Sequence, residues 1–183
     1  MSQLRNDVPI VLGNKKLPKT TAVLNVCPAS MCPSRVLGLC QLRDNGSGCY
    51  AVREERTWAN TCMPSRFAMM GYWDTNDAWT IARDILAYNE AKRTKIRALR
   101  INECGDFRHF GDVEKAEMLA RYLARHGIIA YCYTARRDLD FSDCEHLVVN
   151  GSGWMAHNRF QVAYSLTSPE KGKWLAEDKN GEK

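Results

Sequence analysis

The sequence predicts an α/β fold in which an N-terminal cysteine-rich metal loop precedes an incomplete or open (β/α) barrel-like parallel sheet. Strand-like runs alternate with helix-like segments over residues 96–165, an order typical of parallel sheets with right-handed crossovers. Four of the eight cysteines fall within residues 27–49. The chain of 183 residues suits a single domain, 1–183, but is short for a closed barrel of about 250 residues.

The composition is that of a globular protein. Hydrophobic residues make up 45% of the chain and charged residues 26%, values that exclude intrinsic disorder as the main state. No run of about 18 apolar residues occurs, so no membrane partner is expected. The N-terminal residues lack the apolar core of a secretory signal, and we therefore expect a cytoplasmic protein. In a reducing compartment, clustered cysteines indicate metal ligands or catalytic thiols rather than disulfides.

Hydrophobic periodicity predicts the remaining elements. A short β-favouring run at 20–26 leads into the cysteine-rich cluster loop, 20–50, and residues 49–72 are helical in places. The charged tail, 168–183, is expected to be loosely held. The predicted strands of the β/α units are 96–103, 128–134, 146–150 and 160–165, and the predicted helices are 77–93 and 113–126.

Short polar side chains before the two helices are expected to act as N-caps. Residues 74–76 precede the helix at 77–93, and Asp112 precedes the helix at 113–126. Such side chains accept hydrogen bonds from the free N–H groups of a first helical turn. The first helix is therefore expected to begin near residue 77 and the second near residue 113.

The predicted metal ligands are Cys27, Cys32, Cys40 and Cys49, which are separated by gaps of four, seven and eight residues. A zinc ribbon uses two close cysteine pairs, and no close pair recurs here. The irons of an iron–sulfur cluster are separated in space, so their ligands come readily from a winding loop. We therefore favour an iron–sulfur cluster, of the [4Fe-4S] type, over zinc.

Polar residues follow the predicted strands, and the carboxyl ends of parallel strands carry the chemistry in α/β folds. Two alternatives stay open. Glu103 and Asp106 also suit capping and turn formation, and Cys104 suits burial beside a strand as well as ligation in place of Cys40. The pocket candidates are Asn102, Glu103, Cys104, Asp106, Tyr133 and Arg136.

Three groups of these residues resemble motifs of the phage gene product eighty-eight family. The matches are Cys27-Pro28 with Cys32 and Cys49-Tyr50-Ala51, then Arg100-Ile101-Asn102 with Gly105-Asp106-Phe107, then Tyr131-Cys132-Tyr133-Thr134-Ala135-Arg136. The resemblance runs from about residue 20 to residue 153. It implies a phage or prophage protein of the host cytoplasm, with a cysteine-bound cluster and a partial barrel similar to radical-SAM enzymes.

The chain departs from the patterns of these relatives in three ways. Cys40 lies in a long insertion, and no cysteine follows Cys144, where the family often has a second cluster, so one cluster is expected. The radical-SAM signature C-x3-C-x2-C is absent. A cluster with four cysteine ligands has no open iron for S-adenosylmethionine, whereas three ligands leave one.

Three functions are compatible with these observations. The first is an iron–sulfur protein with redox or radical-SAM-like chemistry, acting with a small molecule or a redox partner. The second is a nucleic-acid-associated protein with a structural metal centre, and the third is a purely structural metal protein. The net charge of +5, together with basic and aromatic residues, supports the second. These residues are Arg136-Arg137, Lys15-Lys16-Lys19, Lys92-Arg93, Lys95, Arg97, Arg100, Trp58 and Trp73.

Overall fold

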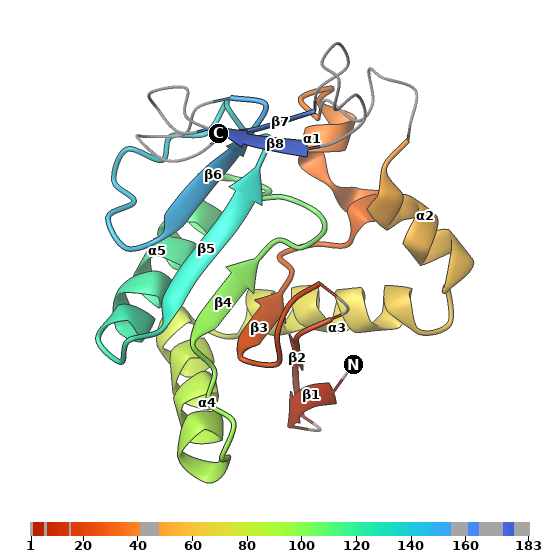
Figure 1. Ribbon diagram of the computed structural model, residues 1–183. Coiled ribbons are helices and arrows are strands. Elements are labelled where there is room, and N and C mark those ends of the chain that lie inside the picture. Colours follow the sequence, from red (N-terminus) through yellow and green to blue (C-terminus); the bar gives the residue numbers. More distant parts are fainter. Residues whose placement is uncertain are drawn as a thin grey trace.

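The computed structural model describes residues 2–5, 7–14, 16–40, 48–154, 161–164 and 174–177. Its strands form one open sheet in the order β1 to β8, so the expected α/β class and the open sheet are confirmed (Figure 1). The central strands β3 to β7 run parallel. The strands are β1 Ser2–Arg5, β2 Val8–Leu12, β3 Thr21–Leu24, β4 Ala98–Ile101, β5 Ile129–Thr134, β6 Val148–Ser152, β7 Gln161–Tyr164 and β8 Trp174–Glu177.

Both edges of the sheet are antiparallel and lie outside the predicted β/α units. The hairpin β1–β2 adds to β3, and β8 adds to β7. Periodicity did not reveal β2, in which Pro9 interrupts the strand-like pattern. Strand β8 lies within the predicted tail, and the residues around it lie outside the described part of the chain.

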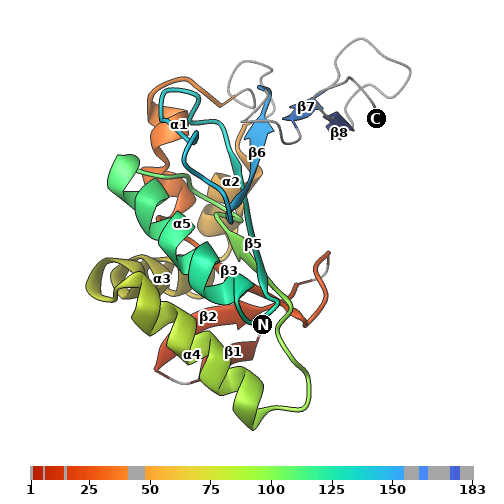
Figure 2. The same cartoon turned by 90° about the vertical axis from the view of Figure 1, so that its left-hand side faces the viewer.

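Helices α3, α4 and α5 pack on one face of the sheet (Figure 2). Leu99 and Ile101 of β4 pair in register with Ala130 and Cys132 of β5, and all four are buried in the core with side chains of α4 and α5. The alternate residues of these strands face the opposite side. The helices are α1 Pro33–Val36, α2 Tyr50–Thr57, α3 Cys62–Thr75, α4 Ala78–Ala91 and α5 Phe110–Ala124, with the 3-10 turn η1 Ala29–Met31.

The structure corrects both predicted caps. The N-cap of α4 is Asp77, whose side chain accepts a 2.7 Å hydrogen bond from the Thr80 N–H, while Asn76 ends α3. Helix α5 begins at Phe110 with His109 as its N-cap, so Asp112 lies in the first turn. Asp112 instead accepts locally from the Arg108 main-chain N–H at 2.9 Å and from the Arg108 guanidinium, and tertiary packing adds Trp73 as a third donor.

Candidate functional site

The cysteine loop leaves the carboxyl end of β3 and folds through η1 and α1. Cys27 is buried, and its thiol donates to the main-chain oxygen of Asp106 at 3.3 Å. The Cys32 thiol lies near enough to Cys27 and Cys40 for their charges to affect its pKa. The described residues therefore bring three of the four predicted ligands into one short loop, and residues 41–47, between Cys40 and Cys49, lie outside them.

Burial raises the pKa of these thiols. The pKa of Cys27 rises to about 11, mainly by burial and despite the hydrogen bond to Asp106. Burial and then the charge of Asp106 raise the pKa of Cys32 further. Both thiols are therefore protonated at neutral pH, whereas a cysteine nucleophile needs a lowered pKa. This environment disfavours a catalytic thiol, and metal ligation at these positions would require both thiols to release their protons.

Cys104 joins this group through a close approach of two chain segments. Its thiol lies 4.0 Å from the Cys27 main-chain oxygen, and Cys49 packs against the small apolar cluster that contains Cys104. The next residue, Gly105, has a φ of 70°, and a Cβ there would lie 2.2 Å from the Cys27 oxygen and 2.8 Å from its sulfur. Only glycine readily adopts this positive φ and needs no room for a Cβ beside Cys27. The glycine of the Gly-Asp-Phe motif therefore allows Cys104 to lie next to Cys27.

A buried ion pair between Glu55 and Arg66, which the sequence did not predict, anchors the start of the cysteine loop. The Glu55 carboxylate of α2 accepts from the N–H groups of Ala29 at 2.7 Å and Ser30 at 2.8 Å. Arg66 of α3 donates to Glu55 at 3.0 Å. The Arg66 charge also acts to lower the pKa of Cys104 against the larger, raising effect of burial. No motif marks Glu55 or Arg66 in the sequence, since their role depends on how α2 and α3 pack.

Asp106 lies inside the fold at the centre of a hydrogen-bond network. It is 3% exposed and accepts from Ser34 Oγ at 2.6 Å, from Thr134 Oγ1 at 2.7 Å and from two main-chain N–H groups at 2.9 Å. These bonds join α1 of the cysteine loop to the carboxyl end of β5. Asp106 therefore positions the loop, which agrees with the alternative role in turn formation.

Arg136 is likewise internal. It is 5% exposed, makes two 2.8 Å hydrogen bonds to the Asp138 carboxylate and donates to the main-chain oxygens of Phe107 and Arg108. Trp73, one of the aromatics counted in support of nucleic-acid binding, is 1% exposed, because its ring belongs to the core and its Nε1 donates to Asp112. Neither side chain is available to a nucleic acid.

Three other pocket candidates lie near one another at the carboxyl end of β4 and β5. Asn102 has a φ of 61°, unusual for a residue other than glycine and often found at functional sites. Its Oδ1 accepts from the Val26 N–H at 3.1 Å. The Glu103 carboxylate accepts from Asn14, and the Glu103 main-chain oxygen accepts from the Tyr50 hydroxyl at 2.9 Å. Tyr133 lies alongside on β5, with the Arg100 guanidinium 5.3 Å from its ring centre.

The other three cysteines are not part of the cysteine loop, although the charges of Arg66 and Glu55 act on Cys62 as they do on Cys104. Cys132 and Cys144 belong to the hydrophobic core, where burial raises the pKa of both thiols, that of Cys144 to about 12. Cys62 begins α3. Across the described ranges, no three His, Cys, Asp or Glu side chains form a group that would hold a metal ion. In the same ranges, no helix is long and apolar enough to cross a membrane.

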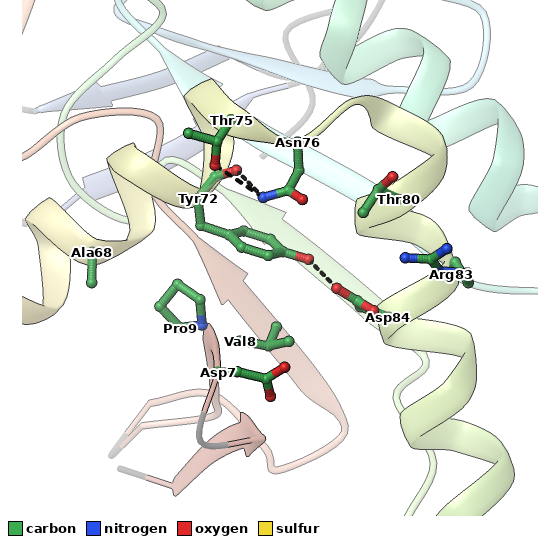
Figure 3. Close-up of a pocket in the computed structure, with 10 residues that line it drawn as sticks. All are labelled: Asp7, Val8, Pro9, Ala68, Tyr72, Thr75, Asn76, Thr80, Arg83 and Asp84. Atoms are coloured by element: carbon green, nitrogen blue, oxygen red, sulfur yellow. Dashed lines mark hydrogen bonds between the residues drawn. The ribbon is translucent and has the colours of Figure 1, made fainter.

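A separate pocket of about 500 Å³ lies between β2, α3 and α4 (Figure 3). Tyr72 donates to Asp84 there at 2.6 Å. None of its lining residues is a cysteine or a pocket candidate, so it is distinct from the cysteine site. The lining residues are Asp7, Val8, Pro9, Ala68, Tyr72, Thr75, Asn76, Thr80, Arg83 and Asp84.

Fold and site together define an open α/β protein with a cysteine-rich loop at the carboxyl end of its parallel strands. The chain belongs to the Gene product 88 family, a phage protein family whose model matches residues 5–174. No curated protein matches it. No solved structure matches it either.

Proposed function

We propose that the protein binds one iron–sulfur cluster of the [4Fe-4S] type through Cys27, Cys32, Cys40 and Cys49. The observation that carries the proposal is that Cys27, Cys32 and Cys40 lie on one short loop, with Cys104 and Cys49 in a small apolar cluster that also holds Ala29 of that loop. Cys104 is the alternative fourth ligand in place of Cys40, because its thiol lies against the main chain of Cys27.

The spacing of the donors favours a cluster over a single zinc ion. A structural zinc site commonly takes its four cysteines from two close pairs, whereas the gaps here are four, seven and eight residues and no close pair recurs. The cysteines of a cluster bind different irons and are spread more widely. The surrounding residues suit such a group, since Ala29 and Gly105 let the backbone approach and Arg66 offsets the negative charge of thiolates.

When bound, a four-iron cluster supplies one-electron transfer, and with three cysteine ligands it also offers an open iron to a small molecule, as radical-SAM-like chemistry requires. The protein supplies the binding site for the cluster. Glu55 and Asp106 fix the two sides of the loop, and the buried thiols must release protons when they ligate metal. Cluster assembly is therefore expected to release protons and to weaken as the pH falls.

Anaerobic purification with analysis of iron, sulfide and zinc tests the proposal. We expect a brown protein with visible absorbance that dithionite bleaches. Serine variants of Cys27, Cys32 and Cys49 should lose this absorbance, while Cys62→Ser and Cys144→Ser, the matched controls, should keep it. Loss in Cys40→Ser or in Cys104→Ser identifies the fourth ligand. A colourless protein with stoichiometric zinc, or a cluster that survives in Cys27→Ser, would contradict the proposal.

A further inference from the structure

The face of the sheet opposite the helices carries an aromatic surface on β5. Tyr131 and Tyr133 alternate along this strand with buried residues, and their ring centres lie 6.2 Å apart in an edge-to-face arrangement. Ile129 begins the same row and is 59% exposed, while Tyr133 is 36% exposed. Parallel sheets are usually covered on both faces, yet helices α3, α4 and α5 lie on one side only (Figure 2). We call Ile129, Tyr131 and Tyr133 with Arg100 the tyrosine face.

Arg100 adds a cation and an unused donor to this face. It lies on β4 in register with Tyr131, and its guanidinium stands over the Tyr133 ring. Among the described residues, two buried side-chain nitrogens have no hydrogen-bond partner: Arg100 Nε and Asn102 Nδ2. They lie two residues apart at the carboxyl end of one strand. Buried donors without partners are rare in native proteins, so these two nitrogens are open to an acceptor atom from a bound water or a ligand.

The charges beside the tyrosine face suit a polyanion. Asn14, in the loop between β2 and β3, donates to Glu103, so this loop reaches the carboxyl end of β4. Lys16, close to Asn14 in this loop, is exposed; Lys19 is also exposed but lies at the amino end of β4, where the Arg97 N–H donates to the Thr20 main-chain oxygen. Burial raises the pKa of Tyr131, and the Glu103 carboxylate, which follows β4, adds a smaller raising effect. A carboxylate at that position is an acceptor for the exocyclic amino groups of nucleobases.

We propose that the tyrosine face binds single-stranded nucleic acid, with bases stacked on Tyr131 and Tyr133 and phosphate or base acceptors bound by Arg100. Aromatic side chains on an open sheet, bordered by cations, are how several single-strand-binding folds hold successive bases. A sheet surface with exposed rings favours a polymer that spans several contacts over a small molecule, which needs an enclosing pocket. The proposal is independent of the cluster.

Fluorescence anisotropy with the full-length protein tests it. The probes are a labelled 12-nucleotide oligothymidylate, its duplex with oligoadenylate, and thymidine monophosphate as competitor. We expect the single strand to bind more tightly than the duplex, with an affinity that falls as salt rises. Tyr133→Ala should weaken binding by about 5- to 150-fold, the range that corresponds to the loss of one stacked base. Tyr133→Phe should bind as the wild type does.

The matched control is Trp79→Ala on α4, which removes an exposed aromatic from the helix-covered side of the molecule. We expect it to leave the affinity unchanged. Circular dichroism of each variant establishes that it is folded. The proposal is overturned if the single strand does not bind at low salt, if the duplex binds as tightly, or if Trp79→Ala loses as much affinity as Tyr133→Ala. Half-displacement of the strand by thymidine monophosphate at a concentration equal to that of the strand would overturn it as well, because the site would then be one for a free nucleotide.

Discussion

Asp112 shows how one buried carboxylate stabilises the contact between two helices. It accepts from Trp73 Nε1 at 2.8 Å and from Arg108 Nε and Nη2 at 3.0 Å each. Its burial acts to raise its pKa, but the hydrogen bonds from Arg108 and Trp73 prevail, so its pKa is lowered. A carboxylate with a lowered pKa in the folded state stabilises the fold above its unfolded pKa of about 3.9. This stabilisation is lost as the pH falls through the folded pKa.

Asp112→Asn is therefore expected to lower the free energy of unfolding by about 1–3 kcal/mol at pH 7. The difference from the wild type should begin to shrink below about pH 4, where the unfolded-state carboxylate becomes protonated, and should vanish once the folded carboxylate protonates at its lower pKa. Urea unfolding at pH 7 and at several values below pH 4 measures it. Glu114→Gln, an exposed change on the same helix, should alter stability little at any pH. A deficit in Asp112→Asn that is the same at all pH values would contradict the electrostatic explanation.

At the scale of the elements, α2 and α3 clamp the cysteine loop through one ion pair. Arg66 contacts two acids: Glu55, whose side chain is 2% exposed, and Glu54, whose side chain is 51% exposed. Removing Arg66 leaves Glu55 as a buried carboxylate without its cation. Arg66→Met is expected to cost about 3–5 kcal/mol of unfolding free energy and to reduce cluster content.

The exposed pair provides the matched control for this prediction. Glu54→Gln removes an interaction of about 0–1 kcal/mol and should leave cluster content unchanged. Urea unfolding and the iron-to-protein ratio measure both effects in parallel. Equal losses in Arg66→Met and Glu54→Gln would show that the buried pair has no special role in holding the loop.

For the whole molecule, the proposed cluster is expected to stabilise the cysteine loop more than the core. The core around β4, β5 and α5 buries large side chains such as Leu99, Ile101, Leu119 and Leu123. The loop presents Met31, Val36 and Leu37 to solvent and is held mainly by polar bonds. Metal binding to a site that the apo chain does not fully preform stabilises that region most.

Removal of iron by an anaerobic chelator should therefore increase amide hydrogen exchange over residues 25–40 and leave β4, β5 and α5 protected. Mass spectrometry of the exchanged peptides measures the change region by region. Chelator saturated with iron beforehand is the control and should alter nothing. An equal loss of protection in the core and the loop would indicate that the entire fold requires the metal.

The sequence predicted much of the central sheet. Alternation located β4, and short β-favouring runs located β3, β5 and β6. The helix boundaries were predicted less well, since Asp77 rather than residues 74–76 caps α4 and Asp112 lies inside α5. Several polar residues precede each helix, and the one that caps it is decided by where the chain enters the turn.

The sequence alone determined the α/β class, the family motifs and the grouping of cysteines in one loop, because periodicity, glycine and proline positions, and spacing are properties of a local stretch of chain. Only the tertiary structure decided that Cys104 lies against Cys27, that Glu55 and Arg66 hold the loop, and that Arg136 is internal. Each of these contacts joins residues from different elements, and the packing of strands and helices sets their distances and burial. Arg100 and Tyr133 came together in the same way, because the register of β4 on β5 places them on one face of the sheet.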